Sequence, residues 1–324
     1  MELAVYFAQI EHVLDLEEAL RPVEIERLPG FLWTAMFDDM NAVEYSTHAM
    51  TVKWLESVYE QGGELSRLYF GQEFCEHLIP PPEDALQAAF AARQLGWGFT
   101  YVTGSVTDAG LQRTTANLKI LDQNGLSCEV VVNDWGVLRC LRRQFPDFTP
   151  TIGRLLLRQQ RLARFSDISS RPVNTREIQT SESAIRTNQR SVLRSTNVSN
   201  AAYRKRIIDA GVQRLDLDIV PQGIDLPEDK WGFEVSCYYP WTYVTGGRNC
   251  LTAALHDPVR QHVVVDGPCS RPCRQINRTL NESTEPSIVQ RGNTVFVVNQ
   301  DYAIPYLDGT IPIDRIVLEP YLPV

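Results

Sequence analysis

The chain has 324 residues, 44% hydrophobic and 22% charged, which is enough apolar material for one large globular domain or two ordinary ones. Its formal net charge is -9, from 31 Lys and Arg against 40 Asp and Glu, so general binding to nucleic-acid phosphates is disfavoured. The N-terminus has no basic region of the signal-peptide kind, and no apolar run approaches the roughly 18 residues that a membrane span needs. We therefore expect a cytoplasmic protein without a membrane span.

Short apolar runs alternate with helical patterns along most of the chain. The expected strands are residues 65–75 (ending near Gly71), 97–106, 126–136, 148–157, 212–223, 230–239, 293–301 and 314–323. The expected helices are residues 82–96, 107–125, 137–145 and 199–211. The first of these has Pro82 at its start and Gly96 at its end, which is typical helix punctuation.

Alternating strands and helices predict parallel pairing with right-handed crossovers. Six or more such units favour a closed (β/α) barrel, so we expect an α/β, TIM-barrel-like single domain over residues 51–324. A doubly wound sheet is the alternative, although no Gly-x-Gly-x-x-Gly or Walker pattern opens any helix.

Two segments fit this alternation poorly. Residues 1–50 are either an N-terminal extension or the first barrel element, and "MELAVYFA" can be a first strand. Residues 164–200 are rich in Ser, Thr, Asn and Arg, and we expect them to form a long polar loop inserted in the barrel, whose arginines can contact a partner.

Seven cysteines are the most informative residues, because grouped cysteines in a reducing cytosol indicate metal or redox chemistry. Cys128 and Cys140 lie in apolar patterns, where core packing is the simpler interpretation. Cys269 and Cys273 stand in the loop sequence "DGPCSRPCRQ", and Cys250 follows the turn "GGRN". A Cys₃His zinc site that uses His256 or His262 stays open, as does an iron–sulfur cluster, which asks for a fourth cysteine.

The stretch "YPWTYVTGGRNC…CSRPC" resembles the cysteine signature of peptidase family U32, the collagenase-like peptidase superfamily. The family motif has an aromatic stretch, an Arg-x-Cys-like step and a Cys-x₃-Cys pair, with Asn249 as a small departure in register here. The stretch "LYFGQEFCEH" is similar to the early cysteine motif of short members of the O₂-independent ubiquinone-hydroxylation (UbiV-like) type. The resemblance covers roughly residues 60–320, apart from the insertion.

The resemblance implies a barrel-like fold and a [4Fe-4S] cluster on Cys75, Cys250, Cys269 and Cys273, with Cys237 as the reserve ligand. It also implies hydroxylation without O₂, with prephenate as oxygen donor, and a heterodimer with a related U32-family subunit. RNA-modifying members place the fourth cysteine where this chain has Tyr243, which disfavours that activity.

Polar residues at expected strand ends are the candidate catalytic groups, because barrel active sites lie at the carboxyl ends of the strands. Arg154 and Arg248 can each hold a carboxylate of a small-molecule substrate. Asp134, beside Asn133, either binds substrate or caps the following helix. Weaker candidates at other strand ends are Gln222, Gly223 and Glu319.

The leading hypothesis is a [4Fe-4S] enzyme, or enzyme subunit, for O₂-independent hydroxylation of a small aromatic or quinone-like substrate. A U32-type peptidase is one alternative, although the chain has neither His-Glu-x-x-His nor Gly-x-Ser-x-Gly. A non-catalytic iron–sulfur partner protein is the other.

Overall fold

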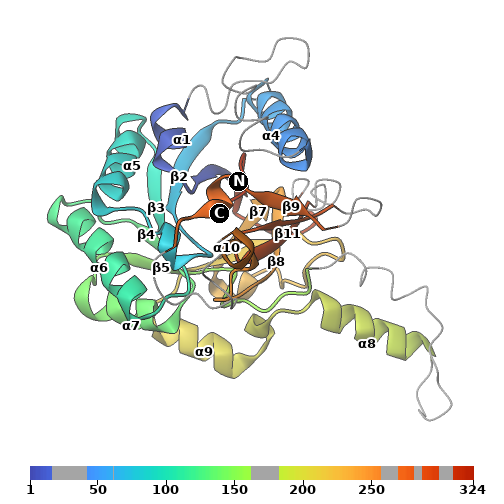
Figure 1. Cartoon of the computed structure of the whole chain (residues 1–324). Coiled ribbons are helices and arrows are strands. Elements are labelled where there is room, and N and C mark those ends of the chain that lie inside the picture. The colour runs from blue at the N-terminus through green and yellow to red at the C-terminus, as the bar shows by residue number, and fades with distance from the viewer. Residues whose placement is uncertain (17–41, 61, 162–181, 257–268, 281–286, 299–308) are drawn as a thin grey trace.

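The computed structural model describes residues 1–16, 42–60, 62–161, 182–256, 269–280, 287–298 and 309–324. Eight parallel strands close into a barrel in the order β1-β12-β7-β6-β5-β4-β3-β2, and helices cover its outside (Figure 1). The barrel strands are β1 (Glu2–Phe7), β2 (Leu65–Gly71), β3 (Gly98–Val102), β4 (Glu129–Val132), β5 (Thr149–Ile152), β6 (Arg214–Asp218), β7 (Glu234–Tyr239) and β12 (Arg315–Leu318). The expected α/β TIM-barrel-like fold is confirmed.

The connections between the barrel strands carry the helices. The α-helices in the described ranges are α1 (Ile10–Leu14), α4 (Ala42–Glu60), α5 (Pro82–Gln94), α6 (Asp108–Gln123), α7 (Trp135–Gln144), α8 (Glu182–Arg194), α9 (Ala201–Asp209) and α10 (Leu251–His256). Short 3₁₀ turns are η1 (Glu76–Leu78), η4 (Asn197–Ser199), η5 (Lys230–Gly232) and η6 (Pro272–Arg274).

Local sequence signals account for where several of these helices begin. Thr107, Asp134 and Asn200 each accept a hydrogen bond from a backbone N–H in the first turn of α6, α7 and α9. Pro82 opens α5, where its missing N–H costs nothing. These caps fix the loops at the carboxyl ends of β3, β4 and β5, and therefore fix the side chains that those loops carry.

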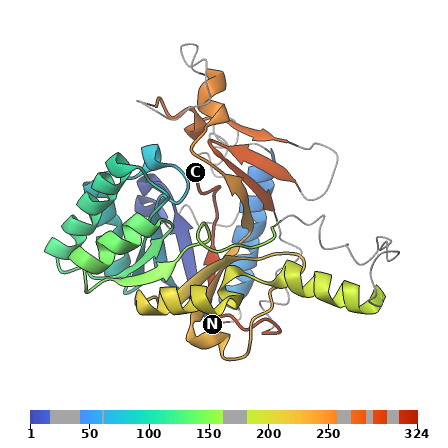
Figure 2. The ribbon, with the colours of Figure 1, turned by 90° about the horizontal axis from the view of Figure 1, so that it is seen from below.

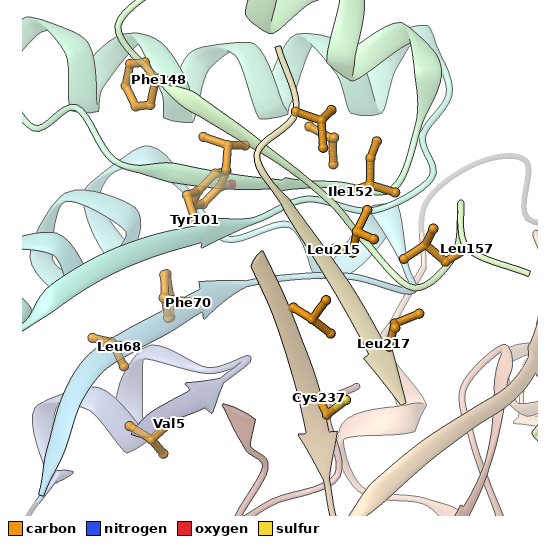
Figure 3. Close-up of a cluster of buried hydrophobic side chains, with 14 of the residues drawn as sticks. Val5, Leu68, Phe70, Tyr101, Phe148, Ile152, Leu157, Leu215, Leu217 and Cys237 are labelled. Carbon is orange, nitrogen blue, oxygen red and sulfur yellow. The ribbon is translucent and has the colours of Figure 1, made fainter. Parts of the chain in front are cut away.

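The main hydrophobic core lies between the barrel wall and the surrounding helices. Figure 3 shows part of it, with Phe70, Ile152 and Leu217 among side chains that come from several neighbouring strands. Apolar side chains on the outer face of parallel strands lose all contact with water, and their burial is the largest favourable contribution to folding.

The inside of the barrel is polar and aromatic. A middle layer contains Tyr6, Tyr69 and Tyr238, whose rings meet edge to face. Arg154 lies against the Tyr238 ring, with 3.8 Å between its guanidinium carbon and the ring centroid. At the other end of the lumen, Arg315 pairs with Glu2 and Glu129. Arg154 and Arg315 are therefore both paired with carboxylates, as their burial requires.

A second sheet stands at the carboxyl end of the barrel. Its four antiparallel strands, in the order β8-β11-β10-β9, are β8 (Trp241–Gly246), β9 (Asn277–Thr279), β10 (Ile288–Arg291) and β11 (Thr294–Val298). All four belong to the connection between β7 and β12. In Figure 2 they lie at the end of the molecule opposite the N-terminus. This sheet covers the face on which barrel active sites are built.

The expected barrel strands from residue 65 to 239, and the strand over residues 314–323, are confirmed. The "MELAVYFA" segment is β1, so the first residues are a barrel element rather than an extension. The strand expected at 293–301 exists as β11, but it belongs to the antiparallel sheet. The long loop expected over 164–200 is wrong for its described part, because residues 182–194 form α8, which projects from the body (Figure 1). Residues 164–181 lie outside the described residues.

None of the helices in the described ranges combines the length and the apolar character that a membrane crossing requires.

Candidate functional site

A cavity of about 620 Å³ lies between the carboxyl end of the barrel and the antiparallel sheet. One wall comes from the loops that follow β2, β3, β4 and β5, and the other from β8, the start of α10, η6 and the β10–β11 turn. Its position matches that of active sites in (β/α) barrels. It is therefore the first place to look for the predicted site residues.

Four cysteines line this cavity: Cys75, Cys250, Cys269 and Cys273. Cys75 follows β2 and stands immediately before η1, while Cys250 stands immediately before α10. The other two flank the turn that leads into η6. The fold thus brings together thiols that are nearly 200 residues apart along the chain, and these are the four that the family resemblance implies as ligands.

Backbone N–H groups point at two of the sulfurs. The N–H of Ala253 donates to the Cys250 sulfur at 3.3 Å, and the N–H of Arg271 donates to the Cys269 sulfur at 3.4 Å. Arg271 itself adopts a left-handed conformation, with φ of 58°. Amide donors of this kind stabilise thiolates and are a recurring feature of iron–sulfur ligands.

The four thiols are close enough for their charges to interact. Burial is the main reason that the pKa of Cys75 rises to about 12, and negative charge on Cys273, Cys250 and Cys269 raises it further. Burial likewise raises the pKa of Cys273 to about 11, with the Arg291 charge acting in the opposite direction. Without a cation beside them, the thiols of Cys75 and Cys273 are therefore protonated at neutral pH.

In the described part of the chain, no group of three or more His, Cys, Asp or Glu side chains is arranged to hold a metal ion. His256, one of the two histidines considered for a zinc site, is exposed at the end of α10 and does not line the cavity. His262 lies outside the described residues.

The remaining cysteines are placed elsewhere. Cys237, the reserve ligand, lies on β7 in the hydrophobic core, where Figure 3 shows it near Leu217. Cys140 is buried on α7, and Thr115 lies 3.5 Å from its sulfur. Cys128 is half-buried against the same core. The core-packing interpretation of Cys128 and Cys140 is confirmed. Cys237 is also a core residue.

Arg154, a candidate carboxylate clamp, lies under the cavity floor and is fully buried. Its guanidinium binds three carboxylates, with nitrogen–oxygen distances of 2.8 Å to Glu73, 2.9 Å to Asp218 and 2.5 Å to Glu319. Arg161 adds a second positive charge on Asp218. A substrate carboxylate can reach Arg154 only by replacing one of these partners.

Burial also changes the acidity of this network. The pKa values of Glu73 and Glu319 are raised, first by burial and then by neighbouring carboxylates, while Arg154 opposes the rise. Three carboxylates against two arginines leave one excess negative charge in a site without water contact. One proton on the carboxylates neutralises this charge, and the raised pKa values of Glu73 and Glu319 favour its binding.

Asp134 and Asn133 end β4 and line the cavity, but their side chains are engaged. Asp134 caps α7 by accepting from Gly136 N at 2.6 Å, so the capping interpretation is confirmed. Asn133 donates to Glu73 and accepts from the N–H of Leu155 at 2.9 Å. Both residues hold neighbouring loops in place around the cavity.

Arg248 is the second candidate clamp, and it lines the cavity from the loop after β8. It is exposed, and its guanidinium reaches the carbonyl of Val106, 3.2 Å away on the opposite wall. Arg271 also faces this cavity. In contrast to Arg154, Arg248 has no ion pair with any residue in the described ranges.

Two weaker candidates lie away from the cavity. Gln222 donates to the carbonyls of Gln160 and Leu193, and so ties together the loops after β5 and β6. Gly223 has a φ of 73°, the left-handed conformation that glycine tolerates best. Glu319 belongs to the Arg154 network.

Two features of the site are absent from the sequence-based prediction. Phe74 and Tyr243 stack across the cavity with ring centroids 5.3 Å apart, joining the two walls. Arg291 and Glu44 form a buried ion pair behind Cys273. The aromatic residue directly before Cys75 is a signal in the sequence for the Phe74–Tyr243 stack. The Arg291–Glu44 pair joins residues 247 positions apart and leaves no local pattern.

Comparison with protein-family models finds no match, and neither does comparison with curated protein sequences.

Proposed function

We propose that the chain is a U32-like protein that holds a [4Fe-4S] cluster on Cys75, Cys250, Cys269 and Cys273. The observation that carries the proposal is the meeting of these four thiols in one cavity at the carboxyl face of the barrel. Each iron of such a cluster takes one thiolate, so four cysteines from separate loops suit it.

A four-iron cluster fits this donor set better than a single zinc ion does. Four thiolates are the usual ligand set of a [4Fe-4S] cluster, whereas the Cys₃His zinc alternative needs a histidine, and His256, the described one of the two considered, does not line the cavity. A cluster is larger and keeps its thiolates farther apart. The N–H donors to Cys250 and Cys269 also match what cluster sulfurs accept.

We further propose that the protein acts in O₂-independent hydroxylation of a small aromatic or quinone-like substrate, with a carboxylate such as prephenate as oxygen donor. When bound, the cluster would supply a site that accepts or activates the donor oxygen. The chain's own contribution is binding: Arg248 and Arg271 bring positive charge to the cavity, and Phe74 and Tyr243 offer an aromatic wall. The antiparallel sheet forms the opposite wall of the cavity.

A non-catalytic iron–sulfur partner protein is the second candidate. Leu251 and Leu255 lie one turn apart on α10, directly after Cys250, and are 40% and 54% exposed. Exposed leucines so close to a redox centre suit docking of another subunit, such as a related barrel protein. On this reading the heterodimer, rather than this chain alone, performs the hydroxylation.

The cluster is tested by iron and sulfide analysis of protein purified and reconstituted without oxygen, together with its visible absorption. We expect about four iron and four sulfide per chain and the broad absorption of a four-iron cluster. A colourless protein that binds no iron contradicts the proposal.

The reaction is tested in cells that lack the chain and grow without oxygen. We expect an aromatic precursor that is not hydroxylated to accumulate, and we expect the wild-type chain, but not Cys250→Ala, to remove it. Unchanged metabolite levels contradict the hydroxylation role. Rescue by a chain altered at Arg248 and Arg271, but not at the cysteines, supports the partner role.

A further inference from the structure

Arg291 holds the loop that carries the last cysteine of the site. It ends β10, and its side chain is only 5% exposed. Its Nε donates to the carbonyl of Cys273 at 2.7 Å, and its Nη2 donates to the carbonyl of Arg274 at 2.9 Å. Two hydrogen bonds from one rigid guanidinium fix the orientation of this peptide segment and of the Cys273 side chain on it.

The charge of Arg291 is balanced by a residue from a distant helix. Glu44 of α4 is 2% exposed, and its Oε1 lies 3.2 Å from Nη1 of Arg291. The other carboxylate oxygen of Glu44 accepts from the side-chain amide of Asn277. Arg291 contacts the cysteine loop directly and Glu44 lies behind it, so the ion pair presents its positive end to Cys273.

Two histidines packed near this pair do not share its charge. His12 and His48 stack on opposite sides of the Tyr321 ring, at 3.8 and 4.7 Å between ring centroids. Burial lowers the pKa of both histidines, to about 3 for His12, so both are neutral at pH 7. Arg291 therefore supplies a permanent positive charge in surroundings where water screens it weakly.

We propose that Arg291 is a positioning residue for Cys273, and that the Arg291–Glu44 pair sets the reduction potential of the cluster held there. This inference rests on the proposed function. Reduction adds one electron to the cluster, from a mediator dye, and breaks no bond. A nearby positive charge favours the form with the extra electron and raises the potential, whereas the Glu44 charge partly offsets this effect.

The test is a potentiometric titration of the reconstituted protein and its variants, without oxygen. Arg291→Gln removes the positive end of the pair, so we expect the potential to fall. Glu44→Gln removes the offsetting charge, so we expect it to rise. For each variant we expect at least a tenfold change in the ratio of reduced to oxidised cluster at a fixed applied potential, about 59 mV for one electron.

Two variants serve as controls. Arg291→Lys keeps the charge, so we expect a potential close to that of the wild type, with some loss of iron if the fork of hydrogen bonds is needed. Arg214→Gln removes another nearly buried arginine, which pairs with the exposed Glu234 at the opposite end of the barrel. We expect it to leave the potential unchanged.

The opposite signs separate an electrostatic role from a structural one, because damage alone moves both variants in the same direction or only lowers iron content. Equal potentials, or shifts of the same sign, in Arg291→Gln and Glu44→Gln overturn the inference. If the wild type still binds the cluster in that case, the proposed function is unaffected. If Arg291→Gln does not fold, the inference is still tested by the other two variants: we expect a raised potential in Glu44→Gln and a potential close to that of the wild type in Arg291→Lys. A wild type that takes up no iron refutes the proposed function and this inference with it.

Discussion

Gly292 shows how one missing side chain shapes the cysteine site. It adopts a φ of 60° in the β10–β11 turn, and an added Cβ would stand 3.3 Å from the Cβ of Cys273 and 3.2 Å from Val324. The glycine therefore serves two purposes: it tolerates the left-handed conformation and leaves room for the cysteine.

We expect Gly292→Ala to lower the free energy of unfolding by about 1–2 kcal/mol from the backbone alone, and by more from the contact with Cys273. We also expect it to reduce iron uptake. The matched control is Gly125→Ala, because Gly125 has a φ of 65° and nothing within 4 Å of an added Cβ. Chemical denaturation and iron analysis of both variants measure the difference. Equal effects of the two substitutions on stability and iron would show that the space beside Cys273 is unimportant.

Asp216 is a second residue whose surroundings matter, because they determine the pKa of its carboxyl group. It is fully buried in the barrel lumen, and one carboxylate oxygen accepts from the Tyr238 hydroxyl at 3.0 Å. Burial raises its pKa to about 7, although Arg315 and Arg214 oppose the rise. The folded protein therefore keeps a proton on Asp216 at pH values where the unfolded chain has already lost it.

This difference predicts a pH dependence of stability. Between about pH 4 and pH 7 the folded state binds more protons than the unfolded state at this residue. The contribution of Asp216 to the free energy of unfolding therefore falls as pH rises, by at most about 1.4 kcal/mol per pH unit. Asp216→Asn removes this contribution. Denaturation at several pH values measures it, and parallel curves for wild type and variant would show that Asp216 does not titrate in this range.

At the scale of elements, Arg154 joins the carboxyl ends of four barrel strands. Its partners Glu73 and Glu319 follow β2 and β12, Asp218 ends β6, and Arg154 itself follows β5. These strands are not all neighbours in the barrel, so the network ties its opposite sides together beneath the cavity. Glu73 stands two residues before Cys75, which links the network to the site.

We expect Arg154→Met to lower the free energy of unfolding by about 3–5 kcal/mol, because it leaves buried carboxylates without their cation. Lys205→Gln is the control. It breaks an exposed pair with Asp209 on α9 and should cost about 0.5 kcal/mol or less. Urea denaturation gives both values. A loss below about 1 kcal/mol for Arg154→Met would mean that the carboxylates are stable without the arginine, as neutral acids.

The elements that the sequence predicts correctly are those with strong local signals. Strands such as β4 are short apolar runs, and α5, α6 and α7 have Pro, Thr or Asp at their starts. The sequence does not predict the antiparallel sheet as a unit, because the pairing of β8 with β11, and of β10 with β9 and β11, leaves no local pattern. The helix α8 was missed because its polar composition resembles that of a loop.

At the scale of the whole molecule, the connection from β7 to β12 folds back over the barrel and completes the cavity. It carries Cys250, Cys269 and Cys273, while Cys75 belongs to the barrel itself. A ligand bound by all four would join the two layers and stabilise their contact. Motif spacing can suggest such a set of cysteines, but only the fold places them in one cavity.

The residues around the cysteines are harder to predict than the cysteines. The sequence favoured Arg154 as a substrate clamp because it follows a strand, yet three carboxylates from distant segments engage it. The Arg291–Glu44 pair gives no local signal either. Ion pairs across a barrel depend on tertiary register, which single-sequence patterns do not contain.

The most direct measurement for the central claim is the iron content of two single variants, reconstituted without oxygen beside the wild type. Cys75 lines the cavity, whereas Cys237 is buried in the core on β7. We expect Cys75→Ala to lose most of the cluster and Cys237→Ala to keep about four iron per chain. The account is contradicted if Cys237→Ala loses the cluster while Cys75→Ala retains it.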